Sequence, residues 1–231
     1  MKKRSILACM LFALGMISCG DIDNMDGPNA AIAGSLIDET TNKPIISEQP
    51  NGFRIKMVET SWSESATPEY FWGKADGTFK NTKIFSATYD VQPVEGAFFP
   101  VEPVSVTIKK SENIDFKVTP YLSIHPKKVE IIGDAIEVEW NISRTKVGDK
   151  ILDTRVFVVH DNPNVGTNYF TTALSPMVDL SSVPDEVVLS TTYKQTITGL
   201  TKGKTYYVKI GARTNNSSKR YNFAETVKLE Y

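Results

Sequence analysis

The chain has 231 residues, of which 41% are apolar and 23% are charged, and its formal net charge is -1. This composition is that of a globular protein, which excludes a disordered or collagen-like chain, and the lack of a basic excess argues against nucleic-acid binding. Both cysteines, Cys9 and Cys19, lie near the N-terminus, so the rest of the chain must fold without an intramolecular disulfide.

The first residues have the pattern of a secretory signal. Positive residues 2–4 precede an apolar run over residues 6–17, which is shorter than the roughly 20 residues that a membrane-spanning helix needs. Residues 14–18, "LGMIS", lie directly before Cys19 and resemble a bacterial lipoprotein signal, in which a small residue precedes the lipidated cysteine. The resemblance implies a signal peptide over residues 1–18 and acyl chains on Cys19. The alternative is an ordinary signal peptide with a chance cysteine.

An acidic, polar stretch follows the cysteine. Asp21, Asp23 and Asp26 lie within residues 19–29, which contain too little apolar surface to form a core and are therefore predicted to be a flexible tether. This stretch resembles the surface-export signal of Bacteroidetes lipoproteins. The resemblance implies anchoring in the outer membrane with the protein facing outward, and the alternative is a solvated linker in an inward-facing lipoprotein.

The remaining chain is predicted to be all-β. Short runs that alternate apolar and polar residues recur between turn dipeptides such as Asn51-Gly52 and Asp76-Gly77, as in β-sandwiches. The length fits two consecutive sandwiches, over residues 30–120 and 121–231, joined near the two prolines of "VTPYLSIHP". The predicted strands are 31–37, 53–58, 78–85, 88–94, 104–108, 114–118, 128–132, 135–142, 154–160, 187–189, 193–197, 206–212 and 226–229.

The second half resembles a fibronectin type III domain. In "ITGLTKGKTYYVKIGART", Leu200, Gly203 and Tyr206 precede alternating apolar residues, and Tyr206 is placed to form a tyrosine corner by bonding to backbone a few residues upstream. Lys202 stands where the pattern usually has proline. Trp140, in "AIEVEWNIS", is predicted to be the large aromatic residue of the core. The segment between 161 and 190 exceeds what a minimal domain needs, so it is predicted to hold extra strands or a binding loop.

The first half resembles a transthyretin-like, carboxypeptidase-regulatory sandwich. The resemblance depends on "IAGSLIDETTNKPI" and on "DGTFKNTKIFSATYDVQP", although Ala87 replaces a usual glycine. That module is not a peptidase, and no His-x-x-Glu motif occurs in the chain. The complete arrangement resembles the two-domain Bacteroidetes lipoproteins that accompany starch-utilisation-type uptake systems, which implies a location and neighbouring proteins but no activity.

Residue patterns that support catalysis are weak. His125 and His160 have no nearby nucleophile in the sequence, and Glu137 and Glu139 share one face of a strand, as solvated residues commonly do. The oxygen-rich segment "DNPNVGTN" from Asp161 lacks the spacing of a calcium loop. We therefore expect no catalytic residue, no metal site and no cofactor.

The aromatic stretch "SWSESATPEYFWG" is the candidate binding site. Trp62, Tyr70 and Trp72 lie in or beside a predicted polar loop, and alternation places Tyr70 and Trp72 on one side and Phe71 on the other. Exposed rings can stack on the apolar C–H faces of sugars. The alternative is that these rings seal the sandwich edge. Phe98 and the following Phe99 are expected to pack at the domain join.

Three functional hypotheses follow from these observations. The favoured one is a non-catalytic accessory surface lipoprotein that assists glycan capture or the assembly of an uptake complex, with polysaccharide and neighbouring uptake-system proteins as partners and no nucleic acid. The second is a structural spacer or adhesion-type surface protein, which would lack an exposed aromatic patch. The third is a hydrolase with an unrecognised site, which a cleft with two converging carboxylates would support.

Overall fold

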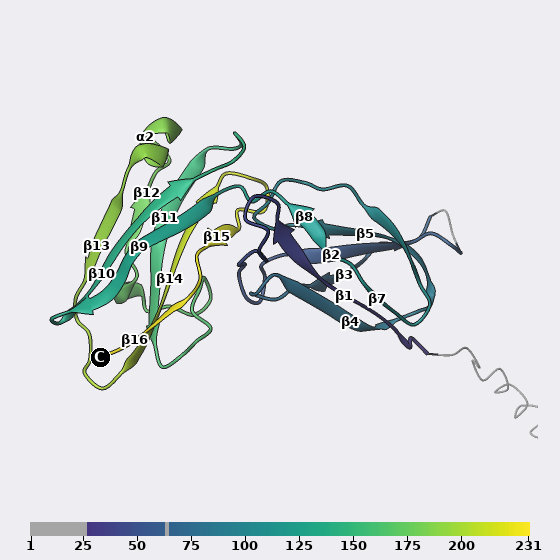
Figure 1. Ribbon diagram of the computed structural model, residues 1–231, viewed down its shortest axis with the longest axis horizontal. Coiled ribbons are helices and arrows are strands. Elements are labelled where there is room, and N and C mark those ends of the chain that lie inside the picture. Colours follow the sequence, from purple (N-terminus) through teal and green to yellow (C-terminus); the bar gives the residue numbers. More distant parts are fainter. Residues whose placement is uncertain (1–26, 63–64) are drawn as a thin grey trace, which may run out of the picture.

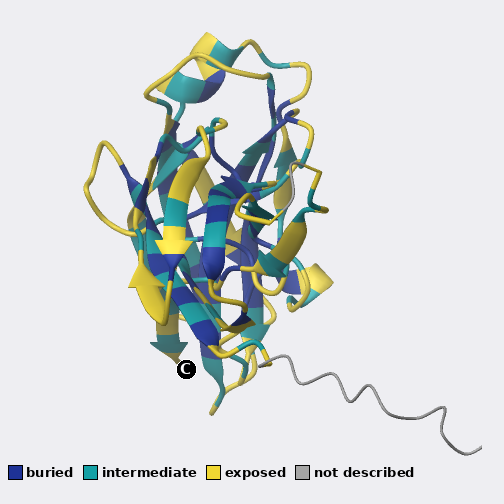
Figure 2. Ribbon diagram, turned by 90° about the vertical axis from the view of Figure 1, so that its right-hand side faces the viewer, coloured by how far each residue is buried: buried dark blue, intermediate teal, exposed yellow. Residues whose placement is uncertain are grey.

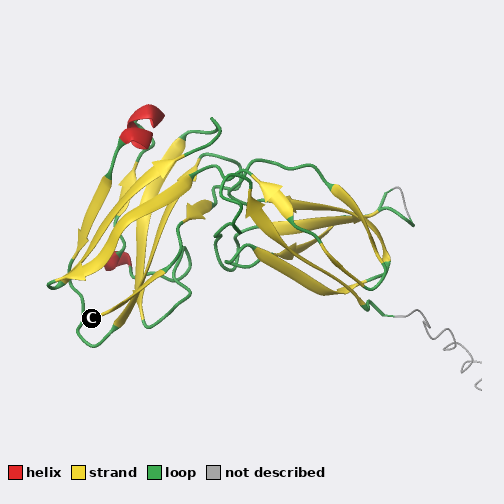
Figure 3. Cartoon of the chain, in the orientation of Figure 1, coloured by secondary structure: helices red, strands yellow, loops and turns green. Residues whose placement is uncertain are grey.

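The computed structural model describes residues 27–62 and 65–231, and over these residues the fold is all-β, as predicted (Figures 1 and 3). The helices described are a 3-10 turn, η2 (Thr172–Leu174), and one short α-helix, α2 (Asp185–Ser190). Within the described part of the chain, no helix is long and apolar enough to cross a membrane. The predicted signal peptide, Cys19 and most of the predicted tether lie outside the described residues.

The first sandwich is formed by strands β1–β8. In one sheet β1 (Ala30–Asp38) pairs antiparallel with β4 (Thr78–Ile84) and parallel with two short strands, β7 (Ser111–Asn113) and β8 (Phe116–Val118). The other sheet is antiparallel, in the order β3-β2-β5-β6, with strands β3 (Glu69–Trp72), β2 (Arg54–Glu59), β5 (Ala87–Val94) and β6 (Val104–Ile108).

Alternation along these strands creates the first core. Every second residue of β1 and of β5 is buried, because successive side chains of a strand point to opposite faces. Figure 2 shows this as alternating dark blue and teal bands along strands, while exposed residues lie in loops and on some of the strands. The largest buried side chains of this core include Ile32, Leu36, Phe53, Ile55, Met57 and Phe79.

The second sandwich contains strands β9–β16. One sheet has the order β13-β10-β9, with β13 (Tyr193–Ile197), β10 (Ala135–Ser143) and β9 (Ser123–Ile132). The other sheet has the order β12-β11-β14-β15 with β16 also on β14, and its strands are β12 (Met177–Asp179), β11 (Ile151–His160), β14 (Thr205–Thr214), β15 (Tyr221–Phe223) and β16 (Val227–Glu230).

Two predicted features of the second core are confirmed. Trp140 is fully buried, stacks on Tyr193 with ring centroids 5.4 Å apart, and donates its indole N–H to the hydroxyl of Thr154 at 3.1 Å. The hydroxyl of Tyr206 accepts a hydrogen bond from the backbone N–H of Thr201 at 2.7 Å, which is the predicted tyrosine corner. Gly203, in the turn between them, has φ of 76°, a conformation that favours glycine.

Three predicted segments differ from the structure. Residues 187–189 were expected to be a strand but lie in α2, whose first turn carries the acidic residues Asp185 and Glu186, a favourable charge for a helix start. The segment around residue 70 was expected to be largely a loop, yet it forms the edge strand β3 because β2 supplies hydrogen-bond partners. Strand β9 begins at Ser123, so it extends into the predicted join and pairs with β10.

A polar contact joins the two sandwiches at Glu48, which lies on the loop after β1 and is 6% exposed. One carboxylate oxygen accepts the backbone N–H of Tyr221 at 2.9 Å, and the other accepts the hydroxyl of Thr167 at 3.1 Å. Ile46 packs on an aromatic cluster of the second sandwich, formed by Phe157, Val165, Tyr221 and Phe223 with the partly buried Val159, Phe170 and Tyr207. The loop before Phe53 is therefore held against the second sandwich.

A second set of contacts lies where the chain passes from one sandwich to the other. Asn222 donates its side-chain amide to the backbone carbonyl of Ala97 at 2.7 Å. Phe98 is buried in the first core and bridges to Pro120, and the ring of Phe99 packs edge-on against Tyr121 at 4.7 Å. The expected packing of both phenylalanines at the join is confirmed.

Candidate functional site

The outward face of the β3-β2-β5-β6 sheet carries two of the three predicted aromatic residues. Tyr70 and Trp72 lie on the edge strand β3 and are 44% and 42% exposed. Phe71, between them, points the other way and packs on Phe79 in the core, with ring centroids 6.2 Å apart. The alternation of a strand therefore explains why two rings of this stretch face solvent and one does not.

Arg54 holds the two exposed rings from the neighbouring strand β2. Its guanidinium carbon lies 4.3 Å from the ring centroid of Tyr70 and 5.5 Å from that of Trp72, which are cation–π distances. The guanidinium also forms an ion pair with Glu95. The guanidinium, held by Glu95, restrains both rings, which stay partly exposed to solvent.

A second arginine reaches Trp72 from the other sandwich. The guanidinium carbon of Arg220 lies 5.9 Å from the Trp72 ring centroid, and its Nη1 lies 3.6 Å from a carboxylate oxygen of Glu48. The aromatic pair is thus connected to the contact between the sandwiches. Sequence reasoning missed both arginines because their positions beside the rings depend on strand pairing and on domain packing.

Polar side chains continue the outward face beyond the rings. Lys56 on β2 pairs with Tyr70 on β3 and with Gln92 on β5. Val58 on β2 pairs with Asp90 on β5. Together with the rings, these ammonium, amide and carboxylate groups can hydrogen-bond to hydroxyl groups while the rings cover apolar surface. We refer to Arg54, Lys56, Tyr70, Trp72, Asp90 and Gln92 as the aromatic face.

Trp62 belongs to a different surface. It is 65% exposed, and its backbone N–H donates to a carboxylate oxygen of Glu59 at 3.0 Å, just after β2 ends. It lines a cavity of about 220 Å³ at the end of the first sandwich, together with Met57, Glu59, Ala66, Thr67, Glu69, Phe85, Ala87 and Tyr89. The structure therefore brings Tyr70 and Trp72 together and places Trp62 on a separate cavity.

A larger cleft of about 620 Å³ lies between the sandwiches. Its walls come from two loops of the first sandwich and from the loop after β11, and its lining is Gln49, Pro50, Lys74, Ala75, Asp76, Asn164 and Tyr169. The Asp76-Gly77 turn and the oxygen-rich loop after Asp161 were visible in the sequence, but nothing in the sequence indicated that they face each other.

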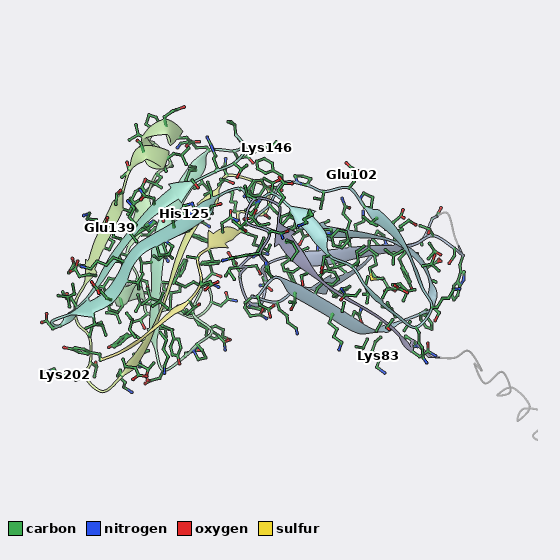
Figure 4. The ribbon with its side chains drawn as sticks, in the orientation of Figure 1. Lys83, Glu102, His125, Glu139, Lys146 and Lys202 are labelled. Atoms are coloured by element: carbon green, nitrogen blue, oxygen red, sulfur yellow. The ribbon has the colours of Figure 1, made fainter. Side chains whose placement is uncertain are left out.

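The histidines lie away from these surfaces. His125 lies on β9 of the second sandwich (Figure 4). Its ring is within hydrogen-bond distance of the Ser143 hydroxyl at 2.7 Å, and both residues are exposed. No carboxylate hydrogen-bonds to His125 among the described residues, so the group that orients a catalytic histidine is not part of this pair. His160 contacts Asp161 at 3.2 Å, and that carboxylate also pairs with Lys204.

Acidic residues on the second sandwich have local partners. Glu137 accepts the hydroxyl of Thr196 at 2.8 Å, and Glu139 pairs with Lys194 at 3.0 Å. Within residues 27–62 and 65–231, no three or more His, Cys, Asp or Glu side chains are grouped so that they could hold a metal ion.

A family of known sequences matches the first sandwich. Residues 30–119 match the family described as "Protein of unknown function (DUF3823) N-terminal domain". No curated protein matches the chain. The match covers the first sandwich, and the narrower resemblance to lipoproteins of starch-utilisation-type systems stays a prediction.

Solved structures share the fold over most of the chain. A DUF3823 family protein from Bacteroides uniformis has a TM-score of 0.77 at 23% identity, covering 88% of this chain and 99% of its own. A protein from the same species named "putative carbohydrate binding protein" has a TM-score of 0.75 at 28% identity, covering 89% and 100%. A DUF3823 family protein from Parabacteroides merdae has a TM-score of 0.72 at 18% identity, covering 89% and 100%.

Proposed function

We propose that this protein is a non-catalytic accessory lipoprotein that binds glycan at the cell surface through the aromatic face. The observation that carries the proposal is the pair of exposed rings, Tyr70 and Trp72, which Arg54 contacts from the neighbouring strand. The 28% identical structure named "putative carbohydrate binding protein" supports a glycan-related role.

The geometry of the rings suits a chain of sugar units. Tyr70 and Trp72 are two residues apart on one strand, so their Cα atoms are separated by about 7 Å along it. At this spacing, each ring can contact a different sugar unit of the same glycan chain. Lys56, Asp90 and Gln92 lie on the same face and can bond to hydroxyl groups, so apolar stacking and polar recognition combine on one surface.

The test is affinity electrophoresis of the purified protein through gels that contain a panel of polysaccharides. We expect at least one polysaccharide to retard the native protein, and Tyr70→Ala and Trp72→Ala each to reduce the retardation. Met177→Ala, which removes an exposed apolar side chain of the second sandwich, is the matched control and leaves mobility unchanged. Unchanged mobility of the native protein with every glycan would overturn the proposal.

The anchor is the second part of the proposal. Cleavage before Cys19 and lipidation of that residue would attach the protein to the outer membrane, with residues 19–29 as the tether and polysaccharide and uptake-system proteins as neighbours. Several acyl chains are needed for stable attachment. We expect Cys19→Ala to lose membrane association on cell fractionation, while the control Cys9→Ala keeps it. Protease treatment of intact cells then tests whether the anchored protein faces outward.

A spacer or adhesion-type role is the alternative. The contacts of Glu48, Asn222 and Phe99 across the two sandwiches favour a rigid rod, which such a role requires. The two roles differ in the aromatic face. A spacer would keep its function after Tyr70→Ala and Trp72→Ala, whereas a glycan-binding protein would not.

A further inference from the structure

The cleft between the sandwiches is open to solvent and has the volume of a ligand site. Its volume of about 620 Å³ falls within the roughly 300–1,000 Å³ of small-molecule sites. Gln49, Pro50 and residues 74–76 form the wall from the first sandwich, and Asn164 and Tyr169 form the wall from the second. A site built from both domains is a common location for a ligand.

The polar groups of the cleft are available to a ligand. Among the described residues, no hydrogen bond is found for the side-chain amide of Asn164 or the hydroxyl of Tyr169, and the Lys74 ammonium interacts with the Asp76 carboxylate through its charge. Asp76 uses one carboxylate oxygen to accept the backbone N–H and the hydroxyl of Thr78, at 3.0 and 2.7 Å, which leaves its second oxygen free. The cleft thus offers both donors and acceptors.

The lining selects against several ligand classes. Lys74 and Asp76 contribute one charge of each sign, so the lining is electrically neutral and does not favour a phosphate or a carboxylate. A single carboxylate is too few for a cation site. The ring of Tyr169 is 50% exposed and lies in the lining with the Pro50 ring, so apolar surface is offered beside the polar groups. An uncharged polyhydroxyl ligand with apolar C–H faces matches this combination.

The two walls are fixed in position before any ligand arrives. Glu48, directly before the cleft residue Gln49, accepts the hydroxyl of Thr167 in the opposite wall. On the first wall, the side-chain carbonyl of Gln49 accepts the backbone N–H of Ala75 at 3.0 Å, and the backbone N–H of Ser47 donates to the carbonyl of Ala75 at 2.9 Å. A site whose walls are already ordered loses little entropy on binding.

We propose that this cleft is a second subsite for a short segment of uncharged oligosaccharide. The inference rests on the proposed glycan-binding function and extends it, because Lys74 in the cleft follows Trp72 of the aromatic face by two residues, about 7 Å of extended chain. One glycan chain can therefore contact the aromatic face and continue into the cleft. The ligand class is neutral sugar, recognised by the Tyr169 ring and by the amides and carboxylate around it.

The test is calorimetric titration of the full-length protein in detergent. The probes are maltohexaose, cellohexaose, xylohexaose and mannohexaose, which are neutral, and hexagalacturonate, which is charged. We expect a neutral probe to bind, and Tyr169→Ala and Asn164→Ala each to raise its Kd about 10-fold, as for central contact residues of an interface. Tyr169→Phe keeps the ring and is expected to retain most of the affinity. Met177→Ala is the control, and thermal unfolding checks that every variant is folded.

The outcomes separate this inference from the proposed function. If a neutral probe binds and depends on Tyr70 and Trp72 but not on Tyr169 or Asn164, the cleft subsite is wrong and the aromatic face stands. If only hexagalacturonate binds, the assignment of an uncharged ligand is wrong. If the cleft variants weaken binding and Tyr70→Ala and Trp72→Ala do not, the subsite stands and the role of the aromatic face is wrong. If none of the probes binds, the cleft subsite for a neutral oligosaccharide is wrong, and the glycan-binding role of the aromatic face is then decided by the polysaccharide gels alone.

Discussion

A carboxylate oxygen of Glu48 accepts a hydrogen bond from the backbone N–H of Tyr221 at 2.9 Å, which joins the loop after β1 to strand β15 of the other sandwich. Lys209 lies close by, and its ammonium donates to the carbonyl of Ser47 at 3.1 Å. The buried carboxylate of Glu48 therefore lies in the contact between the sandwiches, and the buried ammonium of Lys209 lies near it.

Replacing Glu48 is expected to destabilise the protein. Glu48→Ala leaves the N–H of Tyr221 and the hydroxyl of Thr167 without their acceptor and Lys209 without a counter-charge, a change that typically costs about 3 kcal/mol. Urea denaturation measures this loss. Hydrogen exchange is expected to rise in the loop over residues 161–170, which Glu48 holds through Thr167.

Glu48→Gln is the matched control for this change. The amide keeps a carbonyl acceptor for the Tyr221 N–H but removes the negative charge, so its loss should be smaller than that of Glu48→Ala. Equal stability of the native protein and Glu48→Ala would contradict the structural role of this carboxylate.

The pH dependence of stability is expected to report the burial of Lys209. Burial lowers the pKa of Lys209 to about 8, although the negative charge of Glu48 acts to raise it. A lysine in the unfolded chain has a pKa of about 10.4. Between these values the unfolded chain binds more protons than the folded chain, so stability rises with pH. From pH 7.5 to 9.5 the gain is about 2 kcal/mol.

Comparing the native protein with Lys209→Met isolates the contribution of the Lys209 ammonium to the pH dependence of stability. The measurement is the difference in the free energy of unfolding between the native protein and Lys209→Met at both pH values, and the native protein is expected to gain on the variant as the pH rises. Tyr221 has a pKa raised by burial and gives the opposite trend above its ordinary range, so the experiment stays below pH 10. A difference that does not vary with pH would contradict the prediction.

Local patterns in the sequence predicted the parts of the fold that depend on neighbouring residues. Tyr206 and Trp140 were identified because the alternation and turn residues around them are short-range signals. Helix α2 was missed because Val187 and Val188 favour strands, whereas the helix begins at Asp185, whose carboxylate pairs with Arg144 and Lys150. For residues 187–189, tertiary contacts, including the burial of Val188 in the second core, thus outweighed strand propensity.

The candidate sites were only partly predictable for a different physical reason. Exposure of Tyr70 and Trp72 follows from alternation once β3 is a strand, but the pairing with β2 that makes it one is not encoded in its four residues. The cleft depends on Glu48 meeting Thr167, residues 119 positions apart in the chain. Contacts of that separation arise from the packing of whole domains, and no spacing rule within one sequence predicts them.

The tyrosine corner gives a prediction confined to stability. Tyr206→Phe keeps the buried ring but removes the hydroxyl that accepts the N–H of Thr201, so we expect a loss of about 1 kcal/mol in the free energy of unfolding. Chemical denaturation provides the measurement. Retardation in polysaccharide gels should stay at the native level, because Tyr206 lies in the core of the second sandwich. A Tyr206→Phe variant as stable as the native protein would show that water replaces this bond at no cost.

Arg54 is expected to act as a positioning residue for the aromatic face. Arg54→Met leaves a long side chain on β2 but removes the cation beside Tyr70 and Trp72. Each cation–π contact contributes about 0.5–1 kcal/mol at exposed sites. The rings then become less ordered, so glycan affinity is expected to fall about 3-fold, less than for Trp72→Ala. Glu95 loses its ion pair but is exposed, so stability should change little.

Arg54→Lys separates positioning from simple charge. Lysine restores the positive charge but not the planar group that lies against the rings, so it is expected to recover only part of the lost affinity. Tryptophan fluorescence during titration reports the environment of Trp72 directly, and the Trp72→Ala variant identifies its share of the signal. If Arg54→Met binds glycan as the native protein does, the order of the rings does not depend on the arginine, and β3 alone holds them in place.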